Sequence, residues 1–151
     1  MMRAMAAAAL LLHAILAWPH SHEKGDLQVR HPWSRATAPG AKVAVGYMEI
    51  RNNGKVADRL LSASSAAARR VEMHVTQREG DVMRMREVKA FEIPARERLT
   101  LRPGGPHLML VDLAQPLKKG ERFTMTLRFE RAGELAVEFE VQELGSRHPH
   151  H

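Results

Sequence analysis

Apolar and polar residues alternate in short stretches along most of this chain. Such alternation is typical of β-strands that bury one face. Residues that favour turns separate the stretches at intervals of about 8–12 residues, which favours a β-sandwich or barrel. After residue 17, no stretch of ordinary helix length repeats its apolar positions with a helical period, so we expect an all-β domain. The expected strands are 27–30, 43–50, 58–64, 70–76, 82–87, 91–94, 98–101, 107–113, 123–129 and 135–141.

Three connections between these strands carry predictions of their own. Asn52-Asn53-Gly54 predicts a β-hairpin turn, because Asn-Gly tolerates the positive φ angles of tight turns. Arg78-Glu79-Gly80-Asp81 predicts a second tight turn. The loop from Arg102 to Pro106 contains two prolines and leads directly into His107. We expect the prolines to limit the freedom of this loop and so to preorganise the residues after it.

The first residues of the chain differ from the rest. Arg3 precedes an apolar run from Met5 to Leu16, which is typical of a secretory signal peptide and too short for a membrane span. An uncleaved N-terminal anchor is the alternative; after cleavage we expect no stable membrane insertion. The predicted organisation is a signal peptide over 1–17, a flexible arm containing histidine over 18–26, one β-domain over 27–142, and a tail containing histidine over 143–151.

Composition narrows the function classes. The 151 residues suffice for one ordinary domain, and 44% of them are hydrophobic, which is enough for a packed core. There is no cysteine, which excludes disulfides, thiolate zinc sites and blue-copper or binuclear thiolate copper centres. The net charge of +6 comes from scattered basic residues without an aromatic platform, so we expect no nucleic-acid binding. Because no common catalytic motif is present, we do not expect an enzyme.

Histidine and methionine come together between residues 73 and 109, as nowhere else in the chain. Each residue alone is most often structural, since methionine commonly fills cores. The joint pattern is much less expected by chance. Thioether and neutral imidazole suit Cu(I) better than hard cations. The predicted ligands are His74, Met85, His107 and Met109.

Strand geometry gives these four residues a way to meet. A turn centred between Glu79 and Gly80 would place His74 directly opposite Met85, with Cβ atoms roughly 4.5–5.5 Å apart. His107 and Met109 are two residues apart, so on a strand they share one face. Together the two pairs would make a site of two nitrogen and two sulfur ligands. Further candidates from the same stretch are Met73 and Met83, the latter as a reserve ligand or an apolar shield.

Other histidines lie near the two ends of the chain and predict looser sites for Cu(II). A simple solvated tail is the alternative reading. An amino-terminal Cu(II) site after cleavage at Ala17 is disfavoured, because Pro19 has no backbone N–H to give up. These terminal candidates are His20, His22, His148, His150 and His151.

The ligand spacing resembles the H-x₁₀-M-x₂₁-H-x-M motif of the periplasmic PCuA(C) copper chaperones. Residues 33–40 are similar to the family's W-x-R-A-x-x-P-G segment, and 45–54 to its A-x-Y-x…N-x-G stretch. The resemblance covers roughly residues 27–142. It implies a cupredoxin-like Greek-key β-sandwich or barrel and a periplasmic protein that binds Cu(I). It also implies delivery of copper to the CuA centre of cytochrome c oxidase, alongside a Sco-type protein.

Alternatives to this function remain open. A periplasmic copper storage or detoxification protein would use the terminal histidines, and a β-sandwich interaction module would bind no metal. An electron-transfer cupredoxin is disfavoured because it needs a cysteine thiolate. Histidine ligation predicts that Cu(I) affinity falls as pH drops through the usual imidazole range, about 6–7.

Overall fold

The computed structural model describes residues 21–143 and 145. These residues form eleven strands and no helix, so the prediction of an all-β domain is confirmed. All ten expected strands are present, most of them extended by a few residues. The strands are β1 (Ser21–Lys24), β2 (Leu27–Arg35), β3 (Val43–Asn52), β4 (Asp58–Ser64), β5 (Ala68–Glu79), β6 (Val82–Val88), β7 (Phe91–Ile93), β8 (Arg98–Leu101), β9 (His107–Leu113), β10 (Arg122–Phe129) and β11 (Gly133–Gln142).

The eleven described strands form one sheet, in which nine follow the order β6-β5-β9-β3-β2-β11-β10-β4-β7, while β1 pairs with β2 and β8 with β3. The sheet curls around a shared core. Strand β3 changes partner along its length, from β9 in its first half to β8 in its second half. Strand β2 has a bulge between Arg30 and Trp33, where His31 has a φ of +49°. A bulge bends a strand and increases its twist, which helps one sheet to supply both sides of the core.

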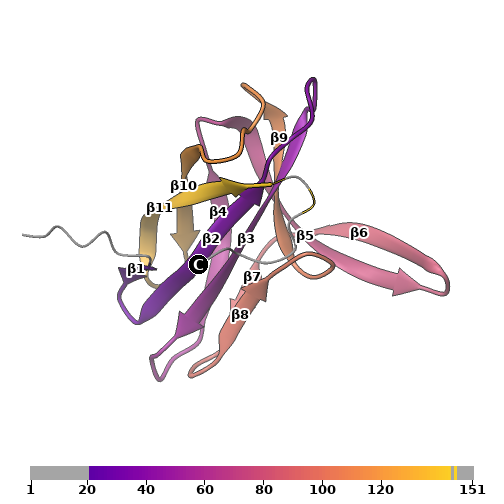
Figure 1. Ribbon diagram of the computed structural model, residues 1–151. Coiled ribbons are helices and arrows are strands. Elements are labelled where there is room, and N and C mark those ends of the chain that lie inside the picture. Colours follow the sequence, from indigo (N-terminus) through magenta and orange to yellow (C-terminus); the bar gives the residue numbers. More distant parts are fainter. Residues whose placement is uncertain (1–20, 144, 146–151) are drawn as a thin grey trace, which may run out of the picture.

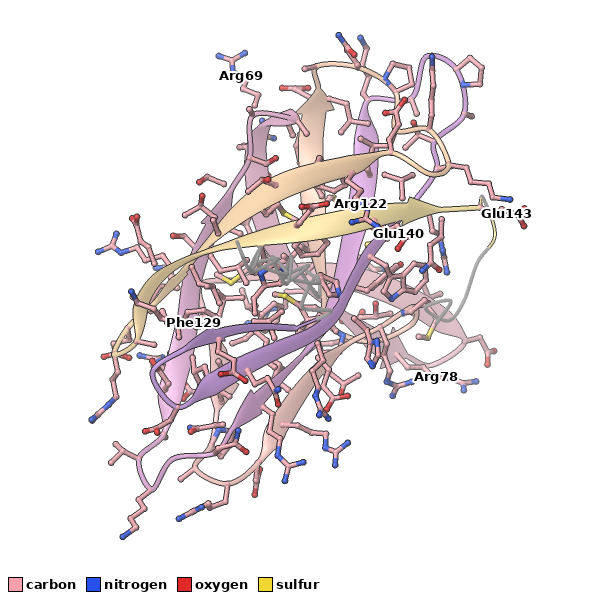
Figure 2. All side chains as sticks on the ribbon, turned by 60° about the vertical axis from the view of Figure 1, so that its left-hand side comes forward. Arg69, Arg78, Arg122, Phe129, Glu140 and Glu143 are labelled. Atoms are coloured by element: carbon pink, nitrogen blue, oxygen red, sulfur yellow. The ribbon has the colours of Figure 1, made fainter. Side chains whose placement is uncertain are left out.

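The core is formed by alternating apolar residues from nearly every strand. Phe129, Phe139 and Leu127 are almost fully buried between the sheet layers. In contrast, Figure 2 shows Arg69 and Arg78, near the two ends of β5, projecting outward on opposite sides of the view. The buried positions of β5 lie toward its Ala68 end, whereas its last residues, up to Glu79, are exposed. Strand β5 thus contributes to the core at one end and extends beyond the core at the other.

The β5–β6 hairpin extends away from the body of the molecule (Figure 1). Strand β5 pairs with β9 from Ala68 to His74, and beyond His74 its only partner is β6. Among the described strands, β6 has no neighbour on its other side, and it is exposed almost throughout. His74 thus lies where the hairpin leaves the sandwich.

The expected hairpin turn at Asn52-Asn53-Gly54 is wrong, because β3 and β4 are not paired. Strand β4 pairs instead with β10 and β7. The Asn52 side chain is buried; its amide donates hydrogen bonds to the carbonyl oxygens of Val56 and Ile93, and its oxygen accepts one from the Gly54 N–H. These bonds stabilise the connection from β3 to β4, which crosses between distant parts of the sheet. Such a crossing connection can contain the same turn-forming residues as a hairpin.

The ends of the chain are only partly described. Within the arm expected over residues 18–26, strand β1 pairs with the first half of β2, from Ser21 opposite Arg30 to Lys24 opposite Leu27. The expected signal peptide, and the expected tail apart from Glu143 and Gly145, lie outside the described residues. Among the described residues, no helix is long and apolar enough to cross a membrane.

Tyr47 gives a direct test of this packing. Its ring lies 4.8 Å from that of Trp33, centroid to centroid, and the Arg35 guanidinium lies 5.5 Å from its centre. Burial raises the pKa of Tyr47, and the Arg35 charge lowers it by less. Tyr47 is the only tyrosine of the chain, so phenolate absorbance reports on it alone. We expect it to titrate above the ordinary value of about 10, and Arg35→Ala to raise its pKa further.

The raised pKa of Tyr47 predicts a loss of stability in strong alkali. As pH rises above the ordinary tyrosine pKa, Tyr47 loses its phenolic proton in the unfolded chain before it does so in the folded protein. The ionisation of Tyr47 therefore lowers the free energy of unfolding. Titration of the folded protein at or below the ordinary value would contradict the observed burial of Tyr47.

Candidate metal site

Two histidines lie side by side where β5 meets β9. His74 and His107 are direct cross-strand partners, with ring centroids 5.6 Å apart and ring planes inclined by 31°. On β9, Leu108 and Leu110 are fully buried in the core. Since successive side chains of a strand point to opposite faces, His107 lies on the other face. The predicted division of β9 is confirmed: Leu108 and Leu110 face the core, and His107 and Met109 share the opposite face.

His107 is buried and held by the loop that precedes it. Its Nδ1 lies 2.9 Å from the carbonyl oxygen of Gly105, to which it donates a hydrogen bond. The loop is itself closed by backbone bonds, from Arg102 N–H to Pro106 oxygen and from Gly105 N–H to Arg102 oxygen. The Nε2 of His107 is buried and has no hydrogen-bond partner. This nitrogen is therefore available to a ligand.

In His74, as in His107, one ring nitrogen is hydrogen-bonded and the other is buried without a partner. Its Nε2 lies 2.8 Å from Glu72 Oε2, whereas its Nδ1 is buried and has no partner. Glu72 Oε1 lies 2.9 Å from Arg70 Nε. The hydrogen bond from His74, followed by that from Arg70, holds the pKa of Glu72 below its usual value, so this carboxylate is ionised.

Met109 lies on the same face as the two histidines. It faces Glu72 across β5 and Val45 across β3. Directly paired residues share a face of a sheet, and Glu72 and His74 are two residues apart on one strand. Three of the four predicted ligands are thus brought to one surface of β5 and β9.

The predicted register of the β5–β6 hairpin is wrong by two residues. Met85 pairs with Thr76, and the residue opposite His74 is Glu87. The turn contains two residues, Gly80, with a φ of +63°, and Asp81. The strands are paired up to this turn, with Glu79 opposite Val82. The turn is thus centred one residue later than expected.

A shift of two residues keeps every side chain on its original face, because the strand period is two. Met85 therefore still shares a face with His74, as a diagonal neighbour rather than a direct one. Diagonal pairs are typically about 7–8 Å apart, which is within reach of a long side chain. Met83 lies on the same face two residues away, opposite Arg78. Met83 and Met85 are similarly exposed, at 58% and 60%.

The remaining candidates are not brought to this surface. Met73 pairs with Leu108 and is buried in the hydrophobic core, on the face opposite the histidines. His22 lies on β1 opposite Val29. The candidates that lie outside the described residues are His20, His148, His150 and His151.

The donors present fit a soft metal ion. The described residues contain no group of three or more His, Asp or Glu side chains arranged to hold a metal. Two imidazole nitrogens without hydrogen-bond partners, with thioethers on the same face, are donors that suit copper.

Two features of the site were missed in the sequence. Glu72 is part of it, and the i, i+2 spacing to His74 within a predicted strand was the signal available. The Gly105 carbonyl had no signal, because every residue carries such a group.

Comparisons with known proteins agree with this fold. The family model described as "Putative lipoprotein LpqE-like" matches residues 27–141. The "Putative lipoprotein Lxx21020" of Leifsonia xyli subsp. xyli (strain CTCB07) is 34% identical over 118 residues, which are 78% of this chain and 70% of the relative.

Solved structures give the same result. The copper-bound PCuAC domain from PmoF2 is 32% identical, with a TM-score of 0.73 over 83% of this chain and 100% of that domain. The CuI-DR1885 structure from Deinococcus radiodurans is 28% identical, with a TM-score of 0.63 over 86% of this chain and 83% of that one. The predicted cupredoxin-like fold is confirmed. The chain belongs to the LpqE-like family and has the fold of the PCuAC domains.

Proposed function

We propose that this protein is a copper chaperone that binds one Cu(I) and passes it to an acceptor protein. The observation that carries the proposal is the pair of buried, unpartnered imidazole nitrogens on adjacent strands, Nδ1 of His74 and Nε2 of His107. Buried polar atoms normally have a hydrogen-bond partner, so two such exceptions side by side indicate a ligand. Two of the structural relatives are described as copper-bound and CuI forms.

Met109 and Met85 complete the proposed site. Neither thioether carries charge or binds protons in the usual pH range, so both remain donors whenever the histidines are neutral. A histidine–methionine site is selective for Cu(I) through the softness of its sulfur donors.

The ligands differ strongly in exposure, and this suggests how copper is released. His107 is 5% exposed, whereas Met85 on the projecting hairpin is 60% exposed. An acceptor can therefore approach the metal from the side of Met85 and displace this ligand first. The histidines would hold copper until the acceptor's own donors replace them.

The acceptor proposed from the resemblance is the CuA centre of cytochrome c oxidase, with a Sco-type protein as a further participant. A periplasmic location agrees with this role. The lipoprotein descriptions of the family and of the Leifsonia relative support a secreted or envelope location.

Anaerobic titration of the purified protein with Cu(I), in competition with a chromophoric chelator, tests the site. We expect one tight equivalent. Met85→Ala should weaken it by about tenfold or more, ~1.4 kcal/mol, through loss of one thioether. Met83→Ala is the matched control because this methionine has similar exposure on the same strand face, and it should change the affinity little.

Each other outcome has a definite meaning. A loss in Met83→Ala alone would make Met83 the ligand in place of Met85. No tight Cu(I) equivalent in the unmodified protein would refute the proposed function.

A further inference from the structure

We propose that Glu72 is a positioning residue, which fixes His74 as the Nε2–H tautomer so that copper is held by Nδ1 of His74 and Nε2 of His107. The metal part of this inference rests on the proposed function. The tautomer part concerns the metal-free protein and stands independently of copper.

The hydrogen bond to Glu72 determines which nitrogen of His74 carries the proton. An ionised carboxylate only accepts hydrogen bonds, so the 2.8 Å contact requires the proton on Nε2. The lone pair of the neutral ring is then on Nδ1, the buried atom without a partner. The side chain of His74 is only 12% exposed, so water offers Nδ1 little compensation.

Glu72 is itself held in place from its other oxygen. Oε1 accepts a hydrogen bond from Arg70 Nε at 2.9 Å, and Arg70 Nη1 lies 3.6 Å from Asp112 Oδ2 on β9. Both carboxylate oxygens of Glu72 are thus engaged, one by Arg70 and one by His74. This fixes the plane of the carboxylate and, through it, the orientation of the imidazole.

His107 has the opposite tautomer for a different reason. A backbone carbonyl also only accepts, so the bond to Gly105 places the proton on Nδ1 and the lone pair on Nε2. The two paired histidines therefore present different nitrogens from rings that are 5.6 Å apart. A side chain sets the tautomer of His74 and the main chain sets that of His107, so only the former can be altered by substitution at its partner.

Glu87 provides a matched control for charge. It lies directly opposite His74 on β6, carries the same charge as Glu72, and has no hydrogen bond to the ring in the described structure. If the role of Glu72 were only to add negative charge near copper, removal of Glu87 would have a similar effect.

The first measurement is ¹⁵N NMR of the imidazole nitrogens in the metal-free protein, at a pH where the rings are neutral. We expect His74 as the Nε2–H form and His107 as the Nδ1–H form. In Glu72→Ala, His74 should become a mixture of tautomers while His107 is unchanged. Glu72→Gln should keep the Nε2–H form only in part, because its single amide oxygen can accept from the ring or from Arg70 but cannot replace both carboxylate oxygens. Glu87→Ala should change neither ring.

The second measurement is Cu(I) affinity in the same proteins. We expect Glu72→Ala to weaken binding about 10–100-fold, as is usual for the loss of a partner that orients a metal ligand. Glu72→Gln should give an affinity between those of Glu72→Ala and the unmodified protein, and Glu87→Ala should leave affinity nearly unchanged.

Three results would overturn the inference: a proton on Nδ1 of His74 in the unmodified protein, an unchanged tautomer in Glu72→Ala, or an equal loss of affinity in Glu87→Ala. If the tautomers are as expected but the unmodified protein binds no Cu(I), the proposed function fails and the effect of Glu72 on His74 stands.

Discussion

Replacing His107 by alanine is expected to weaken Cu(I) binding by more than about 100-fold, the largest effect of any single substitution at the site. Loss of a residue that merely orients a metal ligand costs roughly 10–100-fold, and removal of the ligand itself should cost more. His107 is also the most deeply buried of the proposed ligands, and the Gly105 carbonyl fixes its ring. Competition with a chromophoric Cu(I) chelator under anaerobic conditions measures the change.

The control for this variant is His22→Ala, which removes a histidine from β1, outside the β5–β9 pair. Its Cu(I) affinity should equal that of the unmodified protein. Urea unfolding of His107→Ala, followed without metal, separates loss of the ligand from loss of the fold. A folded His107→Ala protein with Cu(I) affinity within about tenfold of the original would show that His107 is not a ligand.

Replacing Leu108 by alanine is expected to lower the free energy of unfolding by about 2–5 kcal/mol. Leu108 has no exposed surface and lies on β9 between its neighbours β5 and β3. Truncating it leaves a cavity beneath the two histidines, in the layer that fixes their strands. Urea denaturation of the metal-free protein gives the change in stability.

Leu108→Met is the matched control, because it keeps the volume of the side chain and should cost less than about 1.5 kcal/mol. Addition of Cu(I) should raise the denaturation midpoint of both variants, since a ligand that binds only the folded state stabilises it. A loss below about 1 kcal/mol in Leu108→Ala would contradict the packing described for β9.

The sequence by itself determined where ten of the eleven described strands lie and how the side chains of β9 divide between two faces. Alternation of apolar and polar residues is a property of neighbours along the chain, and a strand turns it directly into two faces. The separation of Leu108 and Leu110 from His107 and Met109 follows from this local rule. The same rule places Met83 and Met85 on one face of their strand, whichever register the hairpin adopts.

Register and long-range pairing were decided only by the tertiary structure. The turn at Gly80 shifted the hairpin by two residues and replaced Met85 by Glu87 opposite His74. The pairing of His74 with His107 joins strands far apart in sequence, and no local pattern specifies it. Such choices depend on how the whole sheet closes around its core. The sequence therefore determined the types of the candidate ligands and the strand faces on which they lie, whereas the tertiary structure determined which of them come together.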